Sequence, residues 1–209
     1  MQNFRTGNRL RPQNFQKFSP KIDVNDQQQF RNDVFVAAPM SAYASDDKAY
    51  SDNRDRLLNL FSELKSRTKF RHFFCPAVII DSLHKFDPSE HALVQDVLAL
   101  EASEVFILFY LPPLPSKPSS VFVEAGMALL ARKPSAFIVR SRDDLPYMLR
   151  TADQITVDRL RSSWKQPSFP ESIPTKSFVK IVETGDDNII DVDELAKWFN
   201  ALPLRKRQT

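Results

Sequence analysis

The run Val105-Phe106-Ile107-Leu108-Phe109-Tyr110 decides the fold class of this chain. A strand that is apolar at every position has both faces covered, which is typical of the centre of a parallel sheet packed between helices. A second run, Val34-Phe35-Val36-Ala37-Ala38, is apolar throughout and stops at Pro39, so it predicts another buried strand. The two runs together indicate an α/β protein.

Helical and strand-like segments alternate around these two runs. From the spacing of apolar residues, helices are expected at 51–67, at 91–102, from Ser119 or Ser120 to about Lys133, and at 145–152. Further strands are expected at 73–80, 136–139 and 154–157. In the helix at 91–102, the residues expected to face inward are Leu93, Val94, Val97 and Leu98. The order of the elements predicts a doubly wound, mainly parallel five-stranded sheet with helices on both faces.

The patterning divides the chain into three parts. Residues 1–32 are rich in Asn, Gln, Arg and Phe without periodicity, and we interpret them as a flexible or docking N-terminal arm. Residues 33–157 hold the expected α/β domain. Residues 158–209 are interpreted as an irregular extension, rich in Pro and Ser over 161–186, that ends in a helix at 192–202.

The composition excludes several common classes of site. The chain has 3 glycines, and neither GxxxxGKS/T nor GxGxxG occurs, so Gly-rich phosphate loops are absent. The single cysteine and the 3 histidines lack the spacing of a zinc site, and GxSxG is missing as well. We therefore expect neither a metal nor a bound cofactor.

Charge and hydropathy bear on partners and location. Much of the net charge of +3 comes from basic residues near the two ends, which does not favour a nucleic-acid groove. No apolar run reaches the ~18 residues of a membrane span. The single cysteine, Cys75, cannot form an internal disulfide and is typical of a reducing environment, so a cytoplasmic protein is expected.

Glu124 is the candidate catalytic residue. It lies in Ser119-Ser120-Val121-Phe122-Val123-Glu124-Ala125-Gly126-Met127-Ala128 and is the only charged residue between Lys117 and Arg132. A carboxylate with small and apolar neighbours on a largely apolar helix is costly to bury. The pattern therefore indicates either a raised pKa and a ligand, or a carboxylate that caps or pairs locally.

Asp96 is the second carboxylate of interest. It lies in the middle of the helix expected at 91–102, shortly before the central strand. The same position is compatible with an exposed aspartate on an amphipathic helix.

The carboxyl ends of the strands carry the candidate substrate-binding residues, because ligands bind beyond these ends in open α/β sheets. The segments concerned follow the first, second and central strands, at 38–43, 75–86 and 110–124. The residues selected are Ala38, Pro39, Met40, Tyr43, Tyr110, Ser119 and Ser120, with Met127 one turn after Glu124. The serines supply hydroxyls for a ribose or phosphate or cap the helix, and the tyrosines stack on a base or pack internally.

The order of these motifs resembles the nucleoside 2-deoxyribosyltransferase-like superfamily and its relatives among bacterial TIR-like domains. The resemblance covers about residues 33–157. It rests on Phe35-Val36-Ala37-Ala38-Pro39-Met40, the helix with Asp96, Ala102-Ser103-Glu104-Val105-Phe106-Ile107-Leu108, and the pattern Ser-Ser-x-x-x-Glu-x-Gly-x-Ala-Leu followed by Arg132-Lys133-Pro134.

The resemblance implies a role for each carboxylate. Glu124 would act at the anomeric carbon of a ribosyl group, as the nucleophile of the transferases or in breaking the nicotinamide–ribose bond of NAD in the TIR-like enzymes. Asp96 matches the carboxylate that assists the leaving base in the transferases. The transferases usually carry an aspartate shortly before the glutamate, where this chain has Ser119-Ser120, and that difference fits the TIR-like branch better.

The expected function is therefore N-glycosidic cleavage of a nucleotide by a TIR-like effector of bacterial defence, with NAD as substrate rather than cofactor. Two alternatives are a nucleoside or nucleotide 2-deoxyribosyltransferase or hydrolase, and a non-catalytic nucleotide-sensing or scaffold domain. The expected partners are a nucleotide or nucleoside and further copies of the chain, joined through the N-terminal arm or the C-terminal helix. Neither a nucleic acid nor a membrane is expected as a partner.

Overall fold

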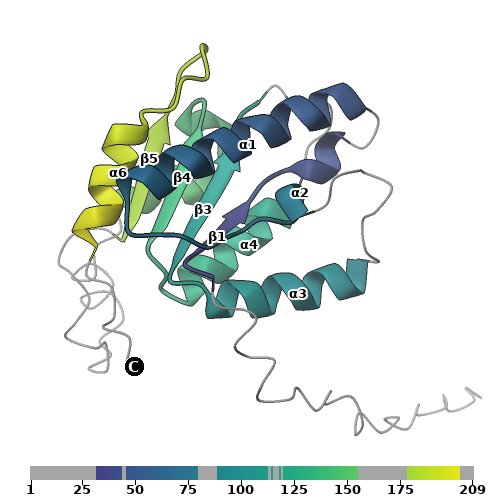
Figure 1. Cartoon of the computed structure of the whole chain (residues 1–209), viewed down its shortest axis with the longest axis horizontal. Coiled ribbons are helices and arrows are strands. Elements are labelled where there is room, and N and C mark those ends of the chain that lie inside the picture. The colour runs from purple at the N-terminus through teal and green to yellow at the C-terminus, as the bar shows by residue number, and fades with distance from the viewer. Residues whose placement is uncertain are drawn as a thin grey trace, which may run out of the picture. The chain divides into compact units, whose positions relative to one another are not determined.

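A five-stranded parallel sheet forms the centre of the protein (Figure 1). The computed structural model describes residues 32–43, 46–79, 89–112, 114, 118, 120–154 and 178–202. The strands are β1 (Val34–Ala37), β2 (Phe73–Phe74), β3 (Val105–Tyr110), β4 (Ser135–Val139) and β5 (Val179–Glu183). Their order in the sheet is β2-β1-β3-β4-β5, which is the doubly wound order with a switch point between β1 and β3. The predicted fold class is confirmed.

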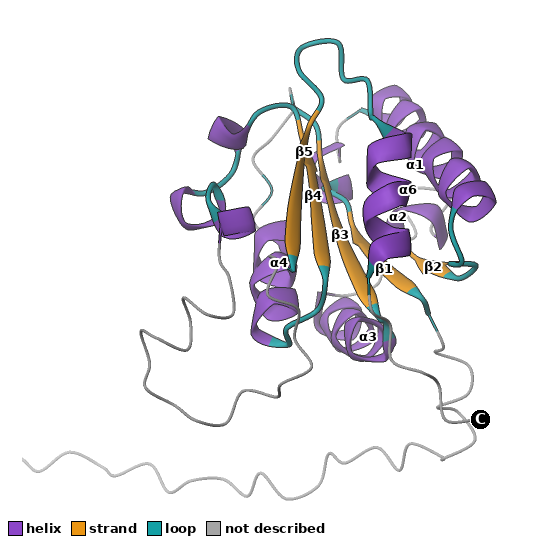
Figure 2. Ribbon diagram, turned by 90° about the vertical axis from the view of Figure 1, so that its left-hand side faces the viewer, coloured by secondary structure: helices purple, strands orange, loops and turns teal. Residues whose placement is uncertain are grey.

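Helices cover both faces of the sheet (Figure 2). The helices are α1 (Asp47–Arg67), α2 (Pro76–Ile79), α3 (Ser89–Ala102), α4 (Ser120–Leu130) and α6 (Val192–Ala201). Four single turns of 3-10 helix complete the described elements: η2 (Met40–Tyr43), η4 (Arg142–Asp144), η5 (Tyr147–Leu149) and η6 (Ala152–Gln154). Side chains of α1, α2 and α6 pack on one face, and those of α3 and α4 pack on the other.

Burial on both faces explains why the sequence of the central strand β3 is apolar throughout. Val105, Ile107 and Phe109 belong to the core on the α1 and α6 face, whereas Phe106 and Leu108 belong to the core on the α3 and α4 face. All five side chains are fully buried. Each residue of a strand points to the opposite face from its neighbour, so a strand covered on both faces must be apolar at every position.

The start of β1 is tied to its neighbours by a buried carboxylate. Asp33 Oδ2 accepts hydrogen bonds from the backbone N–H groups of Arg71, at 2.7 Å, and His72, at 2.9 Å. The carbonyl of Asp33 accepts from the N–H groups of Glu104 and Val105, both at 3.1 Å. Asp33 thus aligns the amino ends of β2 and β3 with β1, and with them the carboxyl ends.

The helices predicted at 51–67, 91–102, 120–133 and 192–202 are confirmed, with small shifts of their ends. The first begins earlier, at Asp47, because Asp46 caps it by accepting a hydrogen bond from the N–H of Ala49 at 2.9 Å. The prediction for the inward side of α3 was wrong. Leu93 and Val94 are each 57% exposed, and Ala99 and Leu100 are the buried residues, because only the last turns of α3 pack closely on the sheet.

Two expected elements were wrong in part. The strand expected at 73–80 is limited to Phe73–Phe74, because Pro76 begins α2. The helix expected at 145–152 is replaced by separate 3-10 turns, since Pro146 precedes η5 and interrupts a continuous helix. Of the strand expected at 154–157, Gln154 lies in η6, and the remainder lies outside the described residues.

The fifth strand of the sheet is β5, at Val179–Glu183, inside the segment that we expected to be irregular. Its register pairs Val179 with Ser135 and Glu183 with Val139. The helix α6 follows it and buries Phe199 completely, with the ring edge-on to Phe70 at 5.3 Å. The compact unit therefore continues beyond residue 157 and includes the C-terminal helix.

No described helix combines the length and the apolar character needed to cross a membrane.

Candidate functional site

The carboxyl end of β1 lies at the switch point of the sheet, where the chain leaves in opposite directions to reach β2 and β3. The turn η2 follows β1, and Tyr110 ends β3. Two carboxylates of the α3 and α4 face, Asp96 and Glu124, are close enough to influence each other electrostatically. We take this pair as the candidate site.

Glu124 lies in the second turn of α4. The helix packs on the sheet through Val121, Ala125 and Ala128, which are fully buried. Glu124 is adjacent to the buried Ala125, so its side chain is half-buried rather than directed into solvent. Burial, and then the negative charge of Asp96, raise the pKa of Glu124 from 4.5 to about 8.

Asp96 lies on α3, one turn before the buried Ala99 and Leu100. Its side chain is half-buried as well, and burial raises its pKa from 3.8 to about 6. An aspartate on the solvent side of a helix would not have this environment. The structure thus separates Asp96 from the freely exposed carboxylates of the surface.

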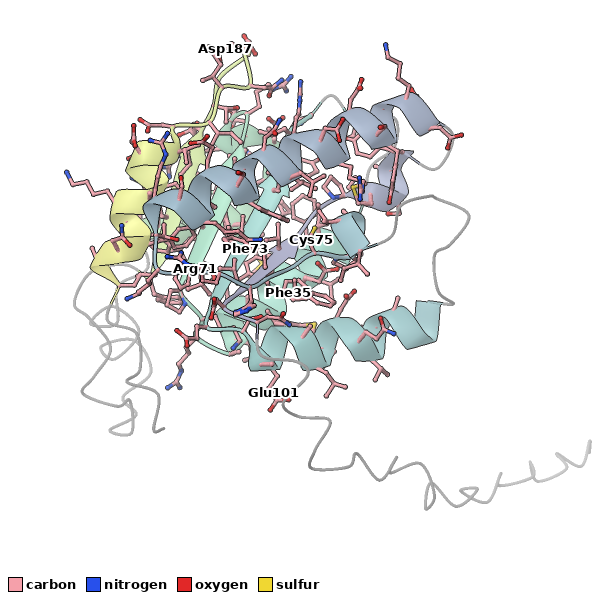
Figure 3. All side chains as sticks on the ribbon, viewed as in Figure 1. Phe35, Arg71, Phe73, Cys75, Glu101 and Asp187 are labelled. Atoms are coloured by element: carbon pink, nitrogen blue, oxygen red, sulfur yellow. The ribbon has the colours of Figure 1, made fainter. Side chains whose placement is uncertain are left out.

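Cys75, which directly precedes α2 and is labelled in Figure 3, is a third group near the pair, and sequence reasoning did not select it. Its side chain is 1% exposed, and burial raises the pKa of the thiol to about 12. The negative charges of Glu124 and Asp96 add to this shift, so all three groups lie within electrostatic range of one another. The available signal was its place directly after the second strand, as the first residue of the segment 75–86.

Neither carboxylate is neutralised by a residue that the structure describes. Among the residues that the structure describes, Glu124 and Asp96 have no hydrogen-bond or ion-pair partner. Arg140 and Arg150, whose charges could have neutralised Glu124, pair instead with Asp144 at 2.9 Å and with Asp143 at 3.3 Å. The interpretation of Glu124 as a locally paired structural residue therefore has no support in the described contacts.

The segment after β1 is mostly core. Met40 and Tyr43 are 3% and 6% exposed and belong to the core on the α1 face. Met40 Sδ accepts a hydrogen bond from Asn53 Nδ2 at 3.3 Å, and burial raises the pKa of Tyr43. Pro39 is buried and Ala38 is half-buried. The structure thus gives Met40 and Tyr43 packing roles. Of the four candidate residues in this segment, Ala38 is the one that is not fully buried.

The segment after β3 is more open. Tyr110 is half-buried, and its ring lies 5.0 Å from that of Phe122, on the first turn of α4. Burial and the charge of Asp144 raise the pKa of the Tyr110 hydroxyl. Ser120 is exposed at the start of α4, and Ser119 lies outside the described residues. Met127 packs against the core beneath α4 as a partly buried side chain.

A separate groove of about 240 Å³ lies on the other side of the sheet. Side chains of α1, of the end of β3 and of the segment before α6 line it: Arg56, Asn59, Leu60, Glu63, Phe109, Leu111, Asn188, Ile190 and Val192. None of the residues predicted for the site is among them. Because the lining contains neither Glu124 nor Asp96, we do not assign the chemistry of the carboxylate pair to this groove.

The described part of the chain contains no group of three or more His, Cys, Asp or Glu residues that could hold a metal ion. Comparison with protein-family models, with curated proteins and with solved structures finds no match to this chain. The geometry and electrostatics of the carboxylate pair are therefore the basis for proposing a function.

Proposed function

We propose that the protein cleaves the N-glycosidic bond of a nucleotide, with NAD as the substrate and Glu124 acting at the anomeric carbon. One observation carries the proposal: two half-buried carboxylates, with raised pKa values and without a described cationic partner, lie on one face of a doubly wound sheet. Perturbed titratable groups of this kind are typical of active sites. The resemblance to TIR-like domains supports the same reaction.

The charge of the substrate explains how such a site would work. Cleavage of the nicotinamide–ribose bond passes through an oxocarbenium-like state, which a nearby carboxylate stabilises. The cationic nicotinamide ring would lower the pKa of Glu124 on binding and favour its ionised form, because opposite charges stabilise each other. The attraction is stronger at a half-buried site than in water, since the local dielectric is lower.

Hydrolysis of the nicotinamide–ribose bond requires only water as a second reactant and no cofactor. The bond between the anomeric carbon and the nicotinamide nitrogen breaks, and its electron pair leaves with neutral nicotinamide. Water adds its oxygen to the anomeric carbon and loses a proton. Asp96, which is mainly ionised above its pKa of about 6, is placed near Glu124 and would accept that proton or hold the water.

A second candidate function follows from the closeness of Asp96 to Glu124. A neutral purine or pyrimidine is a poor leaving group and requires protonation by a general acid. With a pKa raised to about 6, Asp96 is protonated in a larger fraction of molecules than an ordinary aspartate and could supply that proton. This observation favours transfer or hydrolysis of a nucleoside or nucleotide 2-deoxyribosyl group.

Release of free base from a panel of NAD, NADP, nucleosides and deoxynucleotides tests the proposal. We would compare wild type with Glu124→Gln and Asp96→Asn at high protein concentration, and use Glu101→Gln, an exposed carboxylate on α3, as the matched control. Nicotinamide release that Glu124→Gln abolishes supports the NAD reaction. Release from deoxynucleosides that Asp96→Asn also abolishes supports the second function. Binding of nucleotides by wild type and both variants without any release would refute catalysis and favour a sensor.

A further inference from the structure

Arg54 is the side chain of α1 that links it to α2. Its terminal nitrogen Nη2 donates a hydrogen bond to the carbonyl oxygen of Val78 at 3.2 Å. The preceding residue, Asn53, is buried and donates to Met40 Sδ at 3.3 Å. This turn of α1 is therefore attached to the segment that follows β1 and to the segment that follows β2, both at the carboxyl ends of the strands.

The charge of Arg54 is held in place by Val78 but is not neutralised by any described residue. Its side chain is half-buried, and no carboxylate of the described residues lies within ion-pair distance of it. Its Nε atom is enclosed and has no hydrogen-bond acceptor among the described residues. By contrast, Arg67 and Arg142 each pair with two acidic residues.

Arg54 and the carboxylate pair flank the same short helix, α2. Arg54 contacts Val78, near its end, whereas Cys75 immediately precedes its first residue and responds to the charges of Glu124 and Asp96. A helix of 4 residues is about 6 Å long at 1.5 Å per residue. In Figure 1, α2 lies between α1 and α3. Arg54 and the carboxylate pair thus both lie near α2.

We propose that Arg54 binds a phosphate of the substrate and so makes the site select nucleotides over nucleosides. The inference rests on the proposed function, because it takes Glu124 as the group that acts at the anomeric carbon. A guanidinium recognises phosphate through two parallel charge-assisted hydrogen bonds. The terminal N–H groups of Arg54 that are not bonded to Val78 would make these bonds.

Two substrates that differ only in one phosphate isolate the role of Arg54. Nicotinamide mononucleotide and nicotinamide riboside contain the same scissile bond, and only the first carries a 5′-phosphate. We expect wild type to show a kcat/KM at least about tenfold higher for the mononucleotide, as one strong charge-assisted contact provides. Arg54→Gln should remove this preference by slowing the mononucleotide and leaving the riboside unchanged, and Arg54→Lys should restore it only in part.

Arg56→Gln is the matched control. Arg56 lies two residues further along α1, is exposed and has no described ion-pair partner, so its loss should leave the substrate ratio unchanged. The proposal is overturned if Arg54→Gln leaves the ratio unchanged or slows both substrates equally, as a purely structural residue would. Circular dichroism of each variant shows that it is folded.

The proposed function and the role of Arg54 have separate readouts. Loss of all turnover in Glu124→Gln reports on the function, whereas the ratio between the two substrates reports on Arg54. If wild type releases nicotinamide neither from NAD nor from these two compounds, the function fails, and calorimetric binding of the same two compounds tests Arg54. Tighter binding of the mononucleotide that Arg54→Gln abolishes supports the phosphate site, and equal or absent binding refutes it.

Discussion

Asp96 and Glu124 lie on different helices, and the negative charge of Asp96 contributes to raising the pKa of Glu124 to about 8. They come together because α3 and α4 pack on the same face of the sheet. Asp96 has the lower pKa, about 6, so the pair as a whole holds about one negative charge near neutral pH. The protein maintains this charge without a described cationic partner, which makes the pair sensitive to pH and to any bound cation.

Glu124→Gln should raise the free energy of unfolding in alkaline solution. The pKa of Glu124 rises from 4.5 to about 8 on folding, so the folded state holds an extra proton in this window and stability falls as pH rises through it. Each pKa unit corresponds to about 1.4 kcal/mol, but relaxation of a half-buried site reduces the effect. We therefore expect the free energy of unfolding of Glu124→Gln to exceed that of wild type by roughly 2 kcal/mol at about pH 9. At about pH 4 the gain should nearly vanish, because Glu124 of folded wild type is then protonated and as neutral as the glutamine.

Urea unfolding followed by circular dichroism at both pH values measures this difference. Glu101→Gln removes an exposed carboxylate from α3 and should change stability little at either pH. Equal stability of wild type and Glu124→Gln in alkaline solution would mean that the carboxylate is not desolvated.

Asp96→Asn should lower the pKa of Glu124 without returning it to 4.5. Burial is the larger cause of the shift and remains in the variant, whereas the charge of Asp96 is removed. A carbon-13 NMR titration of the Glu124 carboxyl group in both proteins gives the two pKa values. An unchanged titration curve would show that the two carboxylates are not coupled.

Cys75 should be unreactive in the folded protein. Its thiol is buried, and its pKa of about 12 leaves almost no thiolate at about pH 8, whereas an exposed thiol reacts readily there. Labelling with Ellman's reagent should be at least about 100-fold slower in buffer than in urea. Similar rates in the two conditions would indicate that the segment between β2 and α2 opens frequently.

Arg142→Lys should destabilise the junction of β4 and β5. The guanidinium contacts Asp153 through two bonds, at 2.9 and 2.7 Å, and Glu183 through a third at 2.8 Å. Lysine keeps the charge but not the planar fork. Because the Arg142 side chain is 35% exposed, solvent weakens these pairs, and we expect a loss of about 1 kcal/mol that shrinks in high salt.

Arg56→Lys is the control for that measurement, since Arg56 is exposed and has no described ion-pair partner. The two substitutions should differ in their urea midpoints at low salt. A salt-independent loss at Arg142 would point to packing of its aliphatic stem rather than to the ion pairs.

Phe199→Ala should destabilise the whole domain by about 3–5 kcal/mol. Phe199 is fully buried on α6 and packs on Phe70, which precedes β2. Thermal unfolding should show one transition at lower temperature, with Lys197→Ala, an exposed residue of α6, as the control. A domain that keeps its melting temperature in Phe199→Ala would mean that α6 folds separately from the sheet.

Prediction from the sequence succeeded where the signal is local. The continuous run at β3 predicted a central strand, because a strand covered on both faces has no polar position. Apolar spacing located α1, α4 and α6 to within a few residues at each end. Glu124 and Asp96, the two carboxylates selected from the sequence, lie close enough for the charge of Asp96 to raise the pKa of Glu124, and their catalytic role stays a prediction.

Prediction failed where long-range pairing decides the structure. The strand β5 has a short pattern, VKIVE, and lies after a long segment rich in Pro and Ser, so nothing local distinguishes it from a loop. It becomes a strand because Val179 to Glu183 pair with the exposed edge of β4. For Tyr43 the sequence left base stacking and internal packing open, and packing against α1 places it in the core.

The sequence alone determined the class of fold, through its apolar runs and periodicity, which depend only on which faces of an element must be buried. The tertiary structure alone decided which strand completes the sheet and which charged groups meet. Burial and proximity raise the pKa values of Asp96 and Glu124, and both arise only when α3 and α4 pack on the sheet.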